Sequence, residues 1–128
     1  MSQIRILHVD DEPDIREIVD ASLSLNPDFQ VRACASGIDA LVAAVEWSPE
    51  LILLDVMMPK MDGPTTLSEL RKNPRTSDIP VLFMTARAQK REVEQFIAMG
   101  AQGVISKPFD PMTLASEVGS HLHTLRHV

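Results

Sequence analysis

The feature that most constrains the fold is an alternation of short apolar runs with longer segments of helical periodicity along the 128 residues. Strand-length runs that are each followed by a helical segment are typical of βα units, which pair side by side into a parallel sheet. Central strands of such a sheet are covered by helices on both faces and are therefore almost wholly apolar. We predict roughly five βα units, with four runs as central strands: Ile4–Val9, Leu51–Leu54, Val81–Met84 and Val104–Ile105.

The remaining strand and the helices follow from the same periodicities. Segment Phe29–Ala33 alternates apolar and polar residues, which predicts an edge strand. Pro13 suits the first turn of a helix, and Gly100 suits the end of one. Apolar residues at helical spacing predict these buried faces: Ile15, Ile18, Val19 and Leu23; Ile38, Leu41, Val42 and Val45; Leu67 and Leu70; Val93, Phe96 and Ile97; Leu114, Val118, Leu122 and Leu125.

Composition excludes several classes of protein. The formal net charge is −6 and no cluster of Lys and Arg is visible, so a nucleic-acid surface is not expected. Cys34 is the single cysteine, which rules out an intramolecular disulfide and favours a reducing compartment. No secretion signal precedes the first strand, and no apolar run approaches the ~20 residues of a membrane span. We expect one cytoplasmic domain over residues 1–128, with no membrane contact.

Chemically useful residues follow the central strands. Asp10-Asp11, Asp55, Thr85 and Lys107 each stand just beyond an apolar run. Because ligands of parallel α/β sheets bind beyond the carboxyl ends of the strands, these side chains are expected to meet. Three carboxylates held together repel one another and require a cation. Their oxygen atoms favour Mg²⁺, or Mn²⁺ as a substitute, over zinc.

A carboxylate nucleophile, a hard metal and a lysine are the parts required for phosphoryl transfer. Asp55 ends a buried strand and is the best candidate for the nucleophile. Lys107 can pair with a phosphoryl oxygen, and Thr85 can donate its hydroxyl to another. Each residue alone has a simpler explanation: Asp10-Asp11 as an acidic helix start, Asp55 as a turn residue, Lys107 as a surface lysine and Thr85 as a helix cap. Their joint placement at strand ends makes coincidence improbable.

These motifs resemble the receiver domains of two-component response regulators, of the chemotaxis-regulator type, over nearly the whole chain. The matching segments are Asp10-Asp11, Leu53-Leu54-Asp55-Val56-Met57-Met58-Pro59, the loop to Asp62-Gly63, Met84-Thr85-Ala86 and Lys107-Pro108-Phe109. The resemblance implies a doubly wound (βα)5 three-layer sandwich with the flavodoxin-like strand order 2-1-3-4-5. It further implies a phosphoacceptor Asp55 that is served by a histidine kinase or phosphotransfer protein, in a domain that promotes its own phosphorylation and dephosphorylation without being an enzyme in the usual sense.

The same resemblance implies the finer features of the site. Asp11, Asp55 and the backbone carbonyl of Met57 would bind Mg²⁺ directly, with Asp10 acting mainly through water. The Lys107-Pro108 bond would be cis. Phosphorylation would change partner binding through the face formed by the fourth helix, the fifth strand and the last helix.

Three residues depart from the family's common pattern. Val104 stands where the family often has an aromatic residue that changes rotamer with the switch threonine. A valine cannot make that movement. Met57 and Arg87, two residues beyond Asp55 and Thr85, offer no carboxylate or amide to position an attacking water. Slow self-hydrolysis of the phosphorylated form is therefore expected.

Three other functions compete with this interpretation. A haloacid-dehalogenase-like phosphatase needs a second aspartate where this chain has Met57. A flavodoxin-like flavin carrier needs a phosphate-binding loop after the first strand, where Asp10, Asp11 and Glu12 would repel phosphate. A pseudo-receiver that only docks partners would not need the intact set of acids, threonine and lysine.

Overall fold

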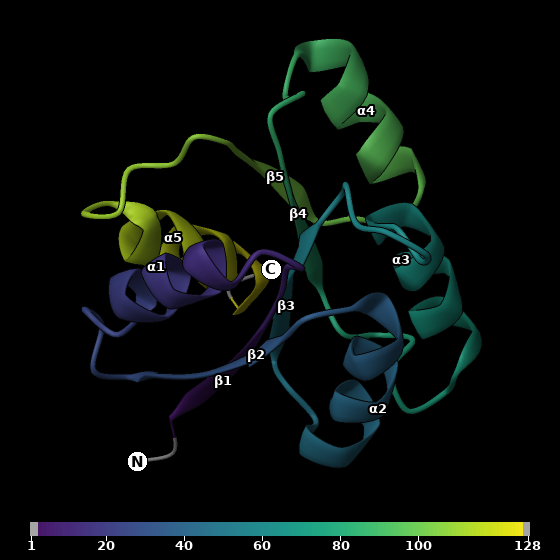
Figure 1. Cartoon of the computed structure of the whole chain (residues 1–128), viewed down its shortest axis with the longest axis horizontal. Coiled ribbons are helices and arrows are strands. Elements are labelled where there is room, and N and C mark those ends of the chain that lie inside the picture. Colours follow the sequence, from purple (N-terminus) through teal and green to yellow (C-terminus); the bar gives the residue numbers. More distant parts are fainter. Residues whose placement is uncertain (1–2, 127–128) are drawn as a thin grey trace.

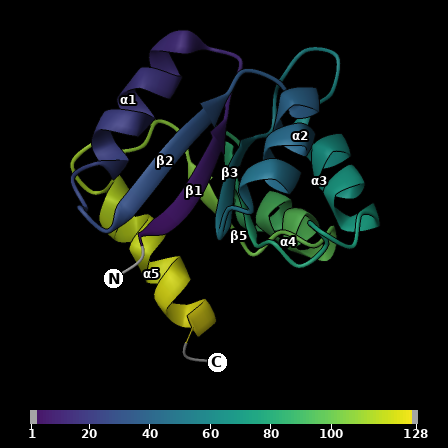
Figure 2. The same ribbon diagram turned by 90° about the horizontal axis from the view of Figure 1, so that it is seen from below.

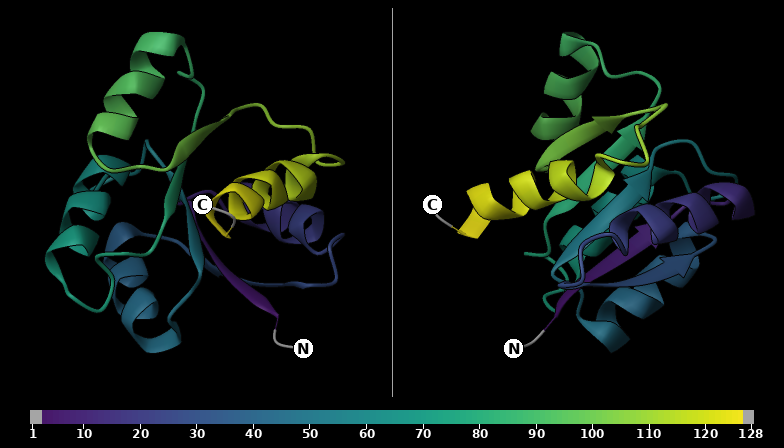
Figure 3. Two further views of the ribbon diagram at one scale, coloured as in Figure 1. Left: turned by 180° about the vertical axis from the view of Figure 1, so that it is seen from behind. Right: turned by 90° about the vertical axis from the view of Figure 1, so that its left-hand side faces the viewer.

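The computed structural model describes residues 3–126, and the side chains of residues 3–122. The five helices of the described residues lie in two layers on either side of a central sheet (Figure 1). Helices α1 (Pro13–Leu23) and α5 (Leu114–Arg126) cover one face, which the view from below also shows (Figure 2). The other face is covered by α2 (Gly37–Trp47), α3 (Gly63–Lys72) and α4 (Lys90–Ala98). Helices α1 and α5 lie side by side on their face (Figure 3). The arrangement confirms the predicted three-layer α/β sandwich.

Strands and helices alternate along the described chain without exception. The strands are β1 (Ile4–Val9), β2 (Phe29–Cys34), β3 (Leu51–Asp55), β4 (Val81–Thr85) and β5 (Gly103–Ser106). No helix among the described residues is long and apolar enough to cross a membrane.

All strand pairs are parallel, and the strand order is β2-β1-β3-β4-β5. This confirms the order that the family resemblance implies and places β2 at an edge, as its alternating sequence predicts. The interpretation of Val104–Ile105 as a central strand is wrong, because β5 forms the other edge. Its apolar residues are explained by helices on both faces: Ile105 packs toward α5, and Val104 packs with the cluster beneath α2, α3 and α4.

The two faces of the sheet carry separate hydrophobic clusters. Ile6, Leu53 and Met84 belong to the cluster under α1 and α5, whereas Leu54 and Phe83 belong to the cluster on the other face. Residues of β3 therefore alternate between the clusters while remaining fully buried, as expected for a strand covered on both sides. This burial holds the end of β3 rigidly in place.

The predicted buried face of α2 is wrong for Ile38 and Val42, whereas Leu41 is partly buried against the core. Ile38 and Val42 are more than half exposed, and the residues that α2 buries are Gly37, Ala40 and Ala44. The cause is a close approach of α2 to α3, since a Cβ atom at Gly37 would collide with Thr66 Oγ1. Only small residues fit where α2 is closest to α3, and Ile38 and Val42 turn outward.

Helix starts agree better with the sequence. Pro13 occupies the first turn of α1. The side chains of Ser36 and Asp62 accept hydrogen bonds from Asp39 N–H (3.1 Å) and Thr65 N–H (2.9 Å), and so cap α2 and α3. Gln89 precedes the first residue of α4, so Thr85 does not cap that helix. That alternative role for Thr85 is wrong.

Candidate functional site

The carboxyl ends of the strands bring the predicted site residues to one edge of the sheet. Asp10 directly follows β1, whose last residue Val9 pairs with Cys34 of β2. Asp55 is the last residue of β3 and pairs with Met84 of β4. Lys107 follows β5, and its backbone N–H donates to the Thr85 carbonyl (2.8 Å). Residues separated by up to 97 positions therefore share one small volume.

Lys107 joins two of the acids. Its ammonium group donates to Asp55 Oδ1 (2.7 Å) and to Asp10 Oδ2 (3.2 Å). The Lys107-Pro108 peptide bond is cis, as the family resemblance implies. The lysine therefore faces the acids, and its interpretation as a solvated surface residue is wrong.

Asp10 is completely buried and is held on all sides. Its Oδ1 accepts a hydrogen bond from Glu12 N–H (2.9 Å), and its own N–H donates to the Cys34 carbonyl (3.1 Å). Its carbonyl accepts a hydrogen bond from Arg16 Nη1 (2.8 Å). Asp10 thus has both carboxylate oxygens occupied, whereas Asp11 and Asp55 Oδ2 accept no hydrogen bond from the described residues.

Burial and charge act against each other at this site. Burial raises the pKa of Asp55, and the nearby Asp10 and Asp11 add to the rise, while the Lys107 hydrogen bond opposes it. Burial alone would lower the pKa of Lys107, but the hydrogen bonds and charges of Asp55 and Asp10 outweigh it and raise that pKa. Lys107 is therefore a firmly charged cation, and Asp55 remains short of positive charge. Additional positive charge at the cluster would favour ionised Asp55.

The donor set fits a hard divalent cation. One carboxylate oxygen from each of Asp10, Asp11 and Asp55 lies within 4.8 Å of the others. Oxygens on opposite sides of a Mg²⁺ ion are about 4.2 Å apart, since each lies ~2.1 Å from the metal. Carboxylate oxygens held this close together can share one such ion. The oxygen-only donors suit Mg²⁺ or Mn²⁺.

Thr85 lies on the neighbouring strand end and is almost completely buried. Its Oγ1 accepts a hydrogen bond from Arg87 N–H (3.0 Å), which leaves the hydroxyl proton available to another acceptor. Val104 is partly buried on β5, and Met57 and Arg87 are exposed at the mouth of the site. Neither Met57 nor Arg87 carries a carboxylate or amide group.

His8 lies two residues before Asp10 and is also fully buried. Neither imidazole nitrogen has a hydrogen-bond partner among the described residues. Burial lowers the pKa of His8 to about 4, against a smaller opposing effect of Asp10. His8 is therefore neutral at physiological pH.

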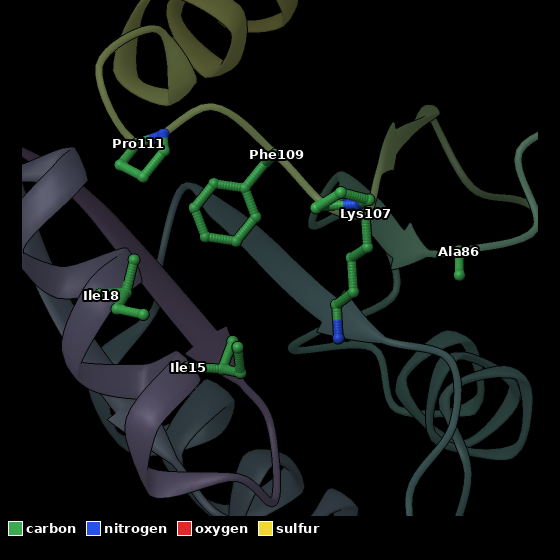
Figure 4. A pocket seen from close by; sticks show the side chains of 7 residues that line it. Ile15, Ile18, Ala86, Lys107, Phe109 and Pro111 are labelled. Atoms are coloured by element: carbon green, nitrogen blue, oxygen red, sulfur yellow. The ribbon is translucent and has the colours of Figure 1, made fainter.

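An apolar pocket of about 390 Å³ adjoins the acid cluster. Figure 4 shows Ile15 and Ile18 of α1 on one side of it, with Phe109 and Pro111 opposite and Lys107 at its inner end. Ile18 was predicted to be buried, but it is 42% exposed because it lines this pocket. The site therefore has an apolar border beside its charged centre.

Two residues that contact the site were not predicted from the sequence. Arg16 donates to the Asp10 carbonyl from the second turn of α1, and its position one turn after Glu12 was a usable signal. Gly63 lies so close to β3 that a Cβ atom there would be 2.5 Å from the Asp55 carbonyl oxygen. Proximity of that kind depends on the packing of α3 against β3, which no local pattern reveals.

Comparison with known proteins agrees with this geometry. A family model described as the response regulator receiver domain matches residues 6–119. The DNA-binding dual master transcriptional regulator RpaA of Synechocystis is 40% identical over 89% of this chain and 47% of its own length. A probable cyclic di-GMP phosphodiesterase of Vibrio cholerae is 34% identical over 98% of this chain and 28% of its own. The chain spans about half or less of the length of these curated relatives.

Solved structures show the same fold. The chemotaxis response regulator CheY4 of Vibrio cholerae superposes with a TM-score of 0.86 at 29% identity, covering 94% of this chain and 99% of its own. A response regulator from Desulfuromonas acetoxidans superposes with a TM-score of 0.83 at 31% identity, covering 95% of this chain and 98% of its own.

Proposed function

Because this chain belongs to the receiver-domain family of response regulators, we propose that Asp55 is its phosphoacceptor, with Mg²⁺ bound beside Asp10, Asp11 and Asp55. One observation carries the assignment: Lys107 joins the buried Asp55 to the buried Asp10 within an acid cluster at the ends of the strands. The haloacid-dehalogenase and flavodoxin alternatives are set aside, since the family match covers most of the chain.

The proposed reaction uses Asp55 Oδ2, the oxygen that accepts no hydrogen bond from the described residues. Asp55 Oδ2 attacks the phosphorus atom of the donor, a new P–O bond forms, and the bond from phosphorus to the leaving group breaks. With a phosphohistidine donor, the leaving imidazole nitrogen keeps the bonding electrons and takes a proton from solvent. Lys107 holds Asp55 Oδ1 and can then follow the negative charge to a phosphoryl oxygen.

The other residues have supporting roles in this proposal. Asp11, Asp55 and the carbonyl of Met57 would hold Mg²⁺ directly, with Asp10 acting through water, and the ion would supply positive charge to the phosphoryl oxygens. Thr85 donates its hydroxyl to a phosphoryl oxygen once that acceptor exists. Movement of Thr85 then shifts the surface formed by α4, β5 and α5, through which the domain changes its binding of partners.

We further propose residues 1–128 as a single receiver domain that receives its phosphoryl group in the cytoplasm from a histidine kinase or phosphotransfer protein. Charge and composition support a protein partner rather than direct contact with nucleic acid or membrane. Its single, unpaired Cys34 is consistent with a reducing compartment.

The assignment is tested with acetyl phosphate, Mg²⁺ and intact-mass analysis. The wild-type chain should gain the mass of one phosphoryl group, and the gain should disappear in Asp55→Asn and in excess EDTA. Asp28→Asn is the matched control, because Asp28 is exposed and directly precedes β2, at the amino ends of the strands and away from the acid cluster. A label that persists in Asp55→Asn, or that forms at full rate in EDTA, would show the assignment to be wrong.

A further inference from the structure

Arg16 makes a contact with the acid pair that the proposed reaction does not use. Its Nη1 donates to the carbonyl oxygen of Asp10 (2.8 Å), and its side chain is partly buried. The backbone N–H of Arg16 donates to the Glu12 carbonyl (3.1 Å), which fixes the residue in the helical turn that follows the acids. Arg16 therefore reaches back from α1 to the segment that joins β1 to α1.

The carbonyl that Arg16 holds belongs to the peptide unit between Asp10 and Asp11. Because a peptide unit is planar, fixing its oxygen fixes the orientation of the following N–Cα bond at Asp11. Asp10 is independently held by Glu12 N–H and Lys107. Asp11 is only partly buried and accepts no hydrogen bond within the described chain. The direction of its carboxylate therefore depends on the backbone that Arg16 holds.

We propose that Arg16 is a positioning residue for the metal site, which directs the Asp11 carboxylate toward the cation by holding the Asp10 carbonyl. The inference rests on the proposed function, because it assumes that Asp11 is a metal ligand. Groups that orient ligands without touching the metal typically change metal affinity by about 10–100-fold when they are removed.

Charge and position make opposite predictions for Arg16. A guanidinium beside a cation site repels the cation, so loss of the charge alone would strengthen metal binding. Loss of the hydrogen bond to the Asp10 carbonyl would free the peptide unit and weaken metal binding. The sign of the change in affinity therefore separates a positioning role from an effect of charge.

The test measures Mn²⁺ binding by the decrease of the free-ion electron paramagnetic resonance signal. Arg16→Met should bind Mn²⁺ about tenfold more weakly than the wild-type chain. Arg75→Met is the matched control, because it removes the same charge from an exposed residue of the α3–β4 loop, at the amino ends of the strands. Its Mn²⁺ affinity should stay within about twofold of wild type. Unchanged or tighter binding by Arg16→Met would overturn the proposal.

Two further variants keep the test decisive. Arg16→Gln is too short to reach the Asp10 carbonyl, so it makes the same prediction if Arg16→Met fails to fold. Arg16→Lys keeps both the charge and a donor and should bind Mn²⁺ more tightly than Arg16→Met; the reverse order would show that charge governs and would overturn the proposal. If the wild-type chain itself binds no Mn²⁺, the proposed metal site fails, whereas equal binding by wild type and Arg16→Met removes only the role of Arg16.

Discussion

Replacing Gly63 by alanine should move Asp55, the proposed phosphoacceptor. A Cβ atom at Gly63 would lie 2.5 Å from the Asp55 carbonyl oxygen and 2.9 Å from Val56 Cα, both of which are backbone atoms. Since ordinary contacts begin near 3.4 Å, α3 and the end of β3 would have to separate by about 0.9 Å, the difference from 2.5 Å. The hydrogen bond from Gly63 N–H to the Val56 carbonyl (2.9 Å) opposes that separation.

Two effects of Gly63→Ala can be estimated. Overpacking of this kind costs about 1–3 kcal/mol in the free energy of unfolding. A displacement near 1 Å at a reacting group can slow a reaction on the order of 100-fold. The first is measured by urea denaturation followed through the fluorescence of Trp47, and the second by the rate of phosphorylation with acetyl phosphate and Mg²⁺.

Gly119→Ala is the matched control for this experiment. Among the described residues, a Cβ atom at Gly119 in α5 would have Phe29 Cζ as its only neighbour within 4 Å, at 4.0 Å. This variant should gain up to about 1 kcal/mol from helix propensity and should be phosphorylated at the wild-type rate. If Gly63→Ala matches Gly119→Ala in both stability and rate, the close approach has no consequence and the reasoning is wrong.

Three further predictions concern the phosphorylated form and pH. The double variant Met57→Asn, Arg87→Glu should lose its phosphoryl group about tenfold faster than the wild-type chain, because its new polar groups can position water; equal or slower decay would contradict this. Beryllofluoride with Mg²⁺ should alter hydrogen exchange across residues 85–109, and no change in an occupied protein would exclude the proposed switch. In metal-free buffer, the free energy of unfolding should fall as the pH drops from 6.5 toward 4, because over this range His8 is protonated in the unfolded chain but not in the folded one. At ~1.4 kcal/mol per pH unit, the loss should reach about 3 kcal/mol. His8→Leu should lack this loss, so parallel stability curves would refute the explanation.

Hydrophobic periodicity, together with capping and turn residues, was sufficient to predict the helices and strands of the fold. The apolar run Leu51–Leu54 could be assigned to a strand because both of its faces are buried, and Ser36 and Asp62 mark helix starts through their own hydrogen bonds. The buried face of α2 could not be predicted, because Ile38 and Val42 have the spacing of a core face. Which face turns inward is decided by the room that α3 leaves, which is a property of the tertiary packing.

The site was predictable to the extent that strand ends determine it. Asp55 and Lys107 meet because parallel strands finish at one edge, a consequence of topology that the alternating pattern already contains. To predict the contact of Arg16 with Asp10, one would have to know the direction in which the Arg16 side chain leaves α1. The contact of Gly63 with β3 needed an interatomic distance. Neither kind of information is carried by the spacing of residues along the chain.

The weak anchoring of α4 sets the energy needed to transmit a signal. No residue of α4 is fully buried, and its principal aromatic contact is between Phe96 and Phe83, whose ring centroids lie 4.9 Å apart. An element held this way can shift for much less free energy than global unfolding requires. A hydrogen bond to a charged group contributes about 1.5–3 kcal/mol, and one new bond from Thr85 to a phosphoryl group would add free energy on that scale beside this weakly held helix. The buried sheet can thus remain in place while α4 shifts at the surface.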